Sequence, residues 1–256
     1  MLHRGMPRFD HYAQGTPCCV ELLTPDPEGA QAFYGPLLGW SFDDLAPDLA
    51  VARKDGAAVA WIRTTEHPRA RWSVHLAVDD VDDVDEVVAQ VAGAGGWVDT
   101  TPSDVLDLGR SATITDPTGA QVGLWQAGSS IGVEVANEPG TLMWNELVSP
   151  DLARGCSFYA AVLGVAWGEM PMGDGSAYTC LVVEGRPVGG AVRPVPAGAP
   201  PHWNVHVNAT DVDATTARAV ALGAVVTVPA HDVPGTGRLA ALTDPQGALL
   251  WLMGLR

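Results

Sequence analysis

The alternation of apolar and polar positions near the start of the chain predicts a strand followed by a helix. Residues 18–24 alternate and end in a Thr-Pro-Asp sequence, which is typical of a half-buried strand. Asp26 is a good N-cap and Pro27 suits the first helical position, so we expect a helix from there to about Leu38. Gly39 would end this helix.

The residues that follow contain further strands and a second helix. Residues 49–63 predict two short strands around an Asp-Gly turn, and residues 73–78 predict another alternating strand. Asp80 would cap the second helix. Four valines form the apolar stripe of that helix, namely Val81, Val84, Val88 and Val91. Two last strands, around residues 110–115 and 121–125, are joined by an Asp-Pro-Thr-Gly turn.

The same succession of motifs returns in the second half of the chain. A Phe-Tyr pair in the first helix, a Trp-x-Val-His strand and an Asp-Pro-x-Gly turn all recur in the same order. The pairs of matching positions are Phe33 and Phe158, Trp72 and Trp203, and Asp116 and Asp244. Because the order and the spacing are both kept, the chain is an internal repeat of two similar halves.

The repeat divides the chain into two domains. We expect an N-terminal extension over residues 1–13, a first domain over residues 14–127, a linker over residues 128–139 and a second domain over residues 140–254. Each domain reads as a strand, a helix and further strands, followed by the same succession again, which we interpret as two βαβββ units per domain, four in total. The predicted fold class is therefore α+β.

This ordered set of motifs resembles the vicinal oxygen chelate superfamily, which includes glyoxalases, bleomycin-resistance proteins and dioxygenases. The resemblance covers nearly the whole chain outside the extension and the linker. It is closest to the fused, two-copy glyoxalase-like or hydroxylase-like proteins of actinobacteria. It implies two cup-shaped curved sheets, each with helices on its convex side and a cavity on its concave side.

Members of this superfamily chelate a divalent metal ion in the cup through residues of four strands. Three of the matching positions hold Cys19, Ser73 and Gly123 in the first copy. In the second copy they hold Trp144, Asn204 and Trp251. The fourth-strand segments, 57–63 and 188–193, contain no carboxylate and no histidine. A divalent ion needs several converging oxygen or nitrogen donors. We therefore expect no metal ion and no other cofactor, with a divalent metal ion as the alternative.

Strand alternation separates the side chains that would line the cups from those of the core. Trp72 and Trp203 fall on the core side. Tryptophans and a few polar groups fall on the cup side, as is usual in small-molecule sites. The predicted ligand-binding residues are Cys19, Trp61, Ser73 and Trp125 in the first cup and Trp144, Asn204, Asn208, Trp251 and Met253 in the second.

Each copy also places one glutamate and one histidine on the cup side. These predicted catalytic residues are Glu21 with His75, and Glu146 with His206. A buried carboxylate beside an imidazole can act as a general acid–base couple, because burial and mutual charge tune both pKa values. The same two groups can equally form a hydrogen-bonded pair that braces the sheet.

Composition and charge restrict the partners of the chain. A formal net charge of −16 disfavours nucleic acid and anionic membrane surfaces. We find no apolar run long enough to span a bilayer and no apolar core of a signal peptide, so we expect a cytoplasmic protein. The four cysteines lack C-x-x-C spacing and fit buried free thiols. Because a fused pair already mimics a dimer, we expect a monomer or a loose homodimer with a small-molecule ligand.

Three functions remain open from the sequence. The first is a binding protein that sequesters an aromatic or polyketide-like metabolite of secondary metabolism. The second is a metal-independent isomerase, cyclase or lyase that uses glutamate and histidine for proton transfer. The third is a metal-dependent glyoxalase, dioxygenase or hydroxylase-type enzyme, which the mismatch at the metal positions disfavours.

Overall fold

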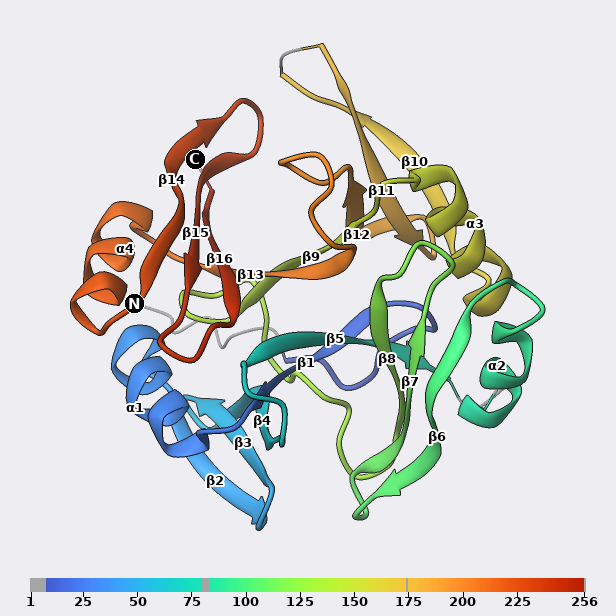
Figure 1. Cartoon of the computed structure of the whole chain (residues 1–256), viewed down its shortest axis with the longest axis horizontal. Helices are drawn as coiled ribbons and strands as arrows, with labels where there is room; N and C mark the ends of the chain where they lie inside the picture. Colours follow the sequence, from blue (N-terminus) through green and yellow to red (C-terminus); the bar gives the residue numbers. More distant parts are fainter. Residues whose placement is uncertain (1–7, 80–82, 174, 256) are drawn as a thin grey trace.

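The computed structural model describes residues 8–79, 83–173 and 175–255, and two curved sheets dominate it (Figure 1). The elements of the first half are β1 (Pro17–Thr24), α1 (Pro27–Leu38), β2 (Ser41–Ala46), β3 (Leu49–Lys54), β4 (Ala57–Thr64), β5 (Arg71–Val78), α2 (Val84–Val91), β6 (Trp97–Val105), β7 (Gly109–Thr115) and β8 (Gln121–Ala127). Those of the second half are β9 (Leu142–Val148), α3 (Leu152–Leu163), β10 (Ala166–Pro171), β11 (Ala177–Val183), β12 (Arg186–Val192), β13 (His202–Asn208), α4 (Val212–Ala221), β14 (Val225–Val233), β15 (Gly237–Thr243) and β16 (Leu249–Gly254).

The strand order confirms the predicted α+β fold of tandem βαβββ units. The first sheet runs β2-β3-β4-β1-β5-β8-β7-β6, and the second runs β10-β11-β12-β9-β13-β16-β15-β14. In each sheet an antiparallel pair, β1 with β5 or β9 with β13, joins the two units at the centre. Each eight-stranded sheet comes from one half of the chain, so the halves do not exchange strands between the sheets.

The first helix has the predicted ends, whereas the second begins later than predicted. Asp26 caps α1 by accepting a hydrogen bond from the Gly29 amide, and Gly39 ends the helix in the left-handed conformation at φ 75°. The N-cap of α2 is Asp83, and the predicted cap Asp80 lies outside the described residues. None of the described helices is long and apolar enough to cross a membrane.

The apolar stripe of α2 also differs from the predicted one. Its buried valines are Val84, Val87 and Val91, while Val88 is only partly buried and Val81 lies outside the described residues. The buried face of the helix therefore includes Val87 in place of the predicted Val88.

Four strands at the sheet edges escaped the sequence analysis. β2 and β6 of the first sheet, like β10 and β14 of the second, have mostly exposed side chains. An edge strand with solvent on both faces shows no apolar alternation, so its sequence resembles a loop. Their pairing partners β3, β7, β11 and β15 define them instead.

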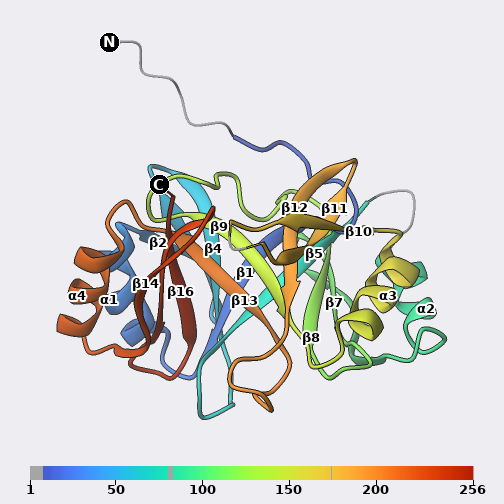
Figure 2. The same ribbon diagram turned by 90° about the horizontal axis from the view of Figure 1, so that it is seen from above.

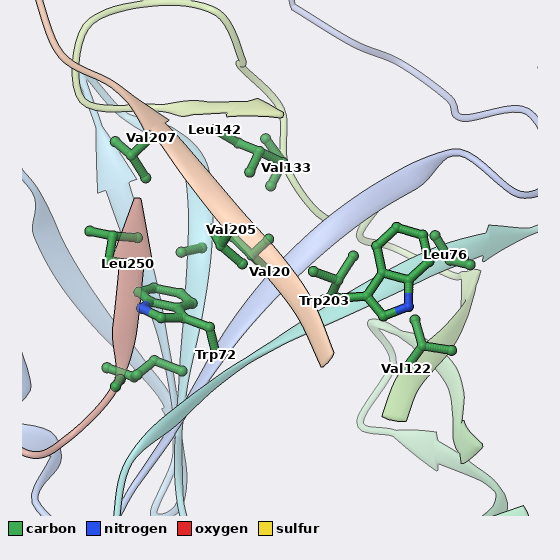
Figure 3. Packing of buried hydrophobic residues seen from close by; sticks show 14 of the residues in the cluster. Val20, Trp72, Leu76, Val122, Val133, Leu142, Trp203, Val205, Val207 and Leu250 are labelled. Atoms are coloured by element: carbon green, nitrogen blue, oxygen red, sulfur yellow. The ribbon is translucent and has the colours of Figure 1, made fainter. Parts of the chain in front are cut away.

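The two sheets share one hydrophobic core. Helix α1 lies beside α4 on one flank, and α2 lies beside α3 on the other (Figures 1 and 2). Figure 3 shows the side chains of both halves meeting between the sheets, with Trp72 and Leu76 of β5 close to Val205 and Trp203 of β13. Both tryptophans lie in this core, as predicted. The cups consequently open away from each other.

A buried tyrosine of each half meets a turn aspartate of the other. The Tyr34 hydroxyl of α1 donates to Asp244 over 2.8 Å and accepts from the indole of Trp72 over 3.1 Å. In the other half Tyr159 accepts from Trp203 and faces Asp116, whose charge adds to the effect of burial in raising the pKa of the phenol. The Asp-Pro-x-Gly turns therefore contribute to the interface between the halves.

The segment between the two sheets packs against the first half. Val133 is buried, and its amide donates to the Cys18 carbonyl over 2.8 Å. The Glu134 amide donates to the Ala58 carbonyl, and its carboxylate accepts from the Ala58 amide. The predicted linker thus covers one end of the first sheet.

Candidate functional site

The concave side of the first sheet contains a cavity of about 540 Å³. Both βαβββ units contribute to its lining, from β1 and β4 in the first to β5 and β8 in the second. Its volume lies within the range of about 300–1,000 Å³ that is usual for small-molecule sites. The lining residues that matter below are Glu21, Leu49, Trp61, Arg63, Arg71, Ser73, His75 and Trp125.

Glu21 lies at the floor of this cavity between a guanidinium and an imidazole. Arg63 Nε donates to Glu21 Oε1 over 2.6 Å, and His75 Nε2 lies 3.5 Å from Glu21 Oε2. The strand register produces this arrangement, because Glu21 is aligned with Trp61 on β4 and with Ser73 on β5. Arg63 and His75 each follow two residues later, hence on the same face of the sheet.

The pKa of Glu21 is lower than its ordinary value. Burial acts to raise this pKa, but the proximity and charge of His75, together with the ion pair to Arg63, outweigh it. The carboxylate is therefore charged at neutral pH, although the residue is only 5% exposed.

His75 is a buried imidazole whose Nε2 lies within ion-pair distance of Glu21. Neither Nδ1 nor Nε2 has a hydrogen-bond partner among the described residues. The ring lies over Gly123 of β8, where a Cβ atom would come within 2.3 Å of Nδ1. Its other neighbour is Trp61, edge-on at 6.3 Å between ring centroids. Both nitrogens are buried, and the carboxylate of Glu21, 3.5 Å from Nε2, lies within ion-pair distance of the ring.

The structure brings three of the four predicted ligand-binding residues of the first cup to the cavity. Trp61 and Trp125 form an aromatic floor, with their rings edge-to-face at 4.6 Å, and Ser73 lies on the adjacent wall. Cys19 is fully buried below that lining. Burial above all raises the pKa of the Cys19 thiol well above its ordinary value, so the thiol stays protonated.

In the second cup, Glu146 has neutral partners. The Tyr178 hydroxyl donates to Glu146 Oε1 over 2.7 Å and accepts from the Trp144 indole over 2.9 Å. The amide of Asn204 donates to Glu146 Oε2 over 3.2 Å, and its carbonyl oxygen lies 2.9 Å from His202 Nε2. Glu146 is thus held by hydroxyl and amide groups where Glu21 has a guanidinium.

The two cups also exchange the positions of a tryptophan and a glycine. Gly190 of β12 is aligned with Glu146, as Trp61 is with Glu21. Conversely, Trp251 of β16 is aligned with His206, where the first cup has Gly123 beside His75. The phenol of Tyr178 occupies the space above Gly190, within 2.0 Å of where a Cβ would lie. Equivalent positions therefore give the two cups differently shaped floors.

The remaining predicted residues of the second cup have structural contacts. Trp251 stacks on His206 with ring centroids 5.6 Å apart. Asn208 donates to the Asn137 carbonyl and so ties β13 to the connecting segment. Met253 is aligned with Asn208 and is half-buried. Glu146 and His206 face the same cup, but a hydrogen bond between their side chains is not found in the described part of the chain.

Comparison with known proteins gives the family. The model of the Glyoxalase/Bleomycin resistance protein/Dioxygenase superfamily matches residues 8–124, and that of a glyoxalase-like domain matches residues 146–253. Together these ranges cover most of the chain. It belongs to the glyoxalase, or vicinal oxygen chelate, superfamily. The predicted superfamily membership is confirmed.

Two relatives align with this chain over almost its full length. It is 43% identical over 256 residues to the Mycobacterium bovis protein CFP32, whose name assigns it provisionally to the glyoxylases, with 95% of this chain and 96% of the relative covered. It is 35% identical over 266 residues to the anthracycline biosynthesis protein DauV of Streptomyces sp. strain C5, with 96% and 95% covered.

Solved structures of the superfamily share the fold at low sequence identity. The Mn(II)-bound glyoxalase from Novosphingobium aromaticivorans aligns with a TM-score of 0.67 at 19% identity, covering 95% of this chain and 83% of the other. The 2,2',3-trihydroxybiphenyl 1,2-dioxygenase of Sphingomonas wittichii aligns with a TM-score of 0.64 at 17% identity, covering 94% and 91%. These likenesses establish the fold alone.

The superfamily implies a divalent metal ion, and the donors of this chain do not fit one. In the first cup the matching positions hold the buried thiol of Cys19, the hydroxyl of Ser73 and the backbone of Gly123. The carboxylate of Glu21 faces the cup but is engaged by the cation of Arg63. Among the described residues, no group of three or more His, Cys, Asp or Glu side chains could hold a metal ion.

The sequence analysis missed two partners of the glutamates, Arg63 and Tyr178. Arg63 lies two residues after Trp61, so the strand alternation that placed Trp61 on the cup side also predicts Arg63 there. Tyr178 belongs to β11, and the long loop-like sequence before it gave no signal of its orientation. The partner of Glu21 could therefore have been sought on β4, whereas no such signal in the sequence indicated the partner of Glu146 on β11.

His206 should make the protein less stable in mild acid. Burial lowers the pKa of His206, against the opposing charge of Glu146 and a backbone hydrogen bond at Trp144. Since the unfolded chain then binds more protons at the group, stability falls as the pH drops below about 6.5, with a slope of at most about 1.4 kcal/mol per pH unit. Urea unfolding at pH 7.5 and 5.5 measures this loss. In His206→Gln the loss between these pH values should shrink, and an unchanged loss would contradict the assignment.

Proposed function

We propose that this superfamily member binds a small planar organic metabolite in its first cup and exchanges a proton with it through His75, without a metal ion. His75 would take a proton from an activated C–H or O–H group, become an imidazolium and return the proton at another atom. The charge of Glu21 would stabilise the imidazolium. The reaction class is that of an isomerase, cyclase or lyase of secondary metabolism.

The observation that carries this proposal is the buried imidazole of His75 beside the Glu21 carboxylate at a cavity floor. Its Nε2 lies 3.5 Å from a carboxylate that stays charged, and neither nitrogen makes a hydrogen bond to a described residue. A carboxylate beside an imidazole fixes the orientation of the ring. The ion pair between Glu21 and Arg63 holds the carboxylate in place, which suits a positioning role for Glu21.

The aromatic floor supports the planar shape of the ligand. Trp61 and Trp125 line the cavity floor beside His75 and are almost fully buried, which makes that floor rigid and apolar. The relative DauV is named for anthracycline biosynthesis, and a planar polycyclic metabolite would fit such a floor.

Proton exchange of a simple ketone tests the proposal. The rate at which 2-tetralone exchanges its C1 hydrogens for deuterium in D₂O can be followed by NMR. We expect the protein to accelerate this exchange, and His75→Gln to lower the accelerated rate at least about a hundredfold, as for loss of a general acid–base group. Glu21→Gln should lower it less, because Glu21 acts through His75.

A matched control and two contrary outcomes make the test decisive. His67 is exposed on the loop before β5 and hydrogen-bonds to Arg69, so His67→Gln should exchange at the rate of the unmodified protein. Exchange that is no faster than in buffer, or equally fast in His75→Gln, would contradict proton transfer. Tight binding of 2-tetralone without accelerated exchange would instead support sequestration by the tryptophan floor.

A further inference from the structure

One wall of the first cup carries an arginine that the acid–base pair does not use. β5 alternates so that Arg71, Ser73 and His75 all line the cavity. At a rise of about 3.3 Å per residue, the Cα atoms of Arg71 and His75 lie about 13 Å apart. Arg71 therefore lies at the rim of the cup, above the floor that holds His75.

The guanidinium of Arg71 is available for an anion. Within the described part of the chain, this guanidinium donates one hydrogen bond, to the side-chain oxygen of Gln121 over 3.3 Å. Among the described residues, no carboxylate lies within ion-pair distance of Arg71, whereas Arg63 is shared by Glu21 and Asp48. A guanidinium has five N–H donors in a fork that matches a carboxylate, so most of its donors are unused.

The acidic residues of the cavity are mostly engaged elsewhere. Asp48 and Glu21 pair with Arg63, and Asp104 pairs with Arg110. Asp99 accepts from the Thr115 hydroxyl and from the amide nitrogen of Gln121. Gln121 thus stands between Asp99 and Arg71, with its amide nitrogen toward the aspartate and its oxygen toward the guanidinium.

The second cup provides an internal comparison, because it keeps the acid–base residues but not the arginines. Arg71 is aligned with Leu23 on β1, and the equivalent residue, aligned with Val148 on β9, is His202. Arg63 is likewise replaced by Val192. Both cations are therefore specific to the first cup.

We infer that the ligand of the first cup is an organic anion, a planar molecule whose carboxylate is held by Arg71 while its apolar body lies on the tryptophan floor. This inference rests on the proposed function, because it names the class of molecule that the same cup takes. The formal net charge of −16 repels anions at long range. An anion is therefore retained through direct, short-range contacts, which a bidentate guanidinium provides.

Two probes of the same shape but different charge test the inference. Isothermal titration calorimetry compares 1-naphthoate with its neutral amide, 1-naphthamide. The unmodified protein should bind 1-naphthoate at least about tenfold more tightly than the amide, which corresponds to one charge-assisted contact. Arg71→Gln should weaken the binding of 1-naphthoate by about tenfold and leave that of the amide within about twofold.

Arg69 and a conservative variant supply the controls. Arg69 is exposed two residues before Arg71 and does not belong to the described cavity lining, so Arg69→Gln should keep the preference for 1-naphthoate. Arg71→Lys keeps the charge but not the fork, and an intermediate affinity is expected. Because Arg71 is exposed, both variants at this position should fold.

The contrary results are distinct from those of the proton-exchange experiment. Failure of 1-naphthoate to bind, equal affinity for both probes, or an unchanged affinity in Arg71→Gln would each overturn the anion site. Exchange of 2-tetralone that still depends on His75 would then leave the proposed function intact. Loss of that exchange with a preserved preference for 1-naphthoate would contradict the proton transfer alone.

Discussion

Replacement of Asp244 by alanine should lower the free energy of unfolding by about 3 kcal/mol, because it leaves several donors unpaired in the core. Asp244 accepts from the hydroxyl of Tyr34 in the other half of the chain and from the backbone amides of Gln246 and Ala248. The residue is 4% exposed, so water cannot replace the lost carboxylate freely. Urea denaturation at pH 7 followed by circular dichroism measures the change.

Two further variants provide the comparison for Asp244→Ala. Tyr34→Phe removes the bond between the halves and also the acceptor of the Trp72 indole, and should cost about 1–2 kcal/mol. Asp151→Ala removes an exposed N-cap of α3, where the carboxylate accepts from the Arg154 amide, and should cost about 1 kcal/mol. A loss in Asp244→Ala no larger than that in Asp151→Ala would show that the aspartate does not couple the halves.

Arg63→Ala should also destabilise the protein by about 3 kcal/mol at pH 7, because it leaves the Glu21 carboxylate buried without its cation. The side chain of Glu21 is only 7% exposed, and Arg63 Nε lies 2.6 Å from it. The loss should diminish in acid. Since the folded pKa of Glu21 is lowered, its contribution is present above its unfolded value of about 4.5 and disappears as the pH falls through the folded pKa.

A neighbouring ion pair of the same length is the matched control. Arg53 Nε lies 2.6 Å from Asp43, but that carboxylate is 58% exposed, so Arg53→Ala should cost less than about 1 kcal/mol. The double variant Glu21→Gln with Arg63→Ala should recover part of the stability lost in Arg63→Ala, since the buried charge is removed as well. Equal losses in the two arginine variants would contradict the argument from burial.

The sequence predicted the repeating framework because its signals are local. The cap at Asp26 and the glycine at position 39 fixed both ends of α1, and both depend only on residues within one turn. Alternation likewise placed Glu21, His75 and Trp61 on the cup side, since successive residues of a strand face opposite sides. The same rule failed for β2 and β6, whose exposed edges have no apolar face.

The partners of each buried charge depended on contacts that are distant in sequence. Glu21 and Glu146 occupy equivalent positions, yet one meets Arg63 and the other meets Tyr178. Cys19 faces the same way as Glu21 but lies below the cavity, where the aromatic floor and the segment after β8 enclose it. Sequence periodicity gives the direction of a side chain, but not how deeply other elements cover it.

The sequence by itself therefore determined the repeat, the α+β fold, the helix caps and which faces of the strands line the cups, because short-range backbone geometry dictates these features. Only the tertiary structure decided that Tyr34 joins Asp244, that tryptophan and glycine exchange places between the cups, and that Arg71 stands at the rim of the first cup without a carboxylate partner in the described chain. These features depend on how the sheets curve and pack, which sets distances between residues far apart along the chain.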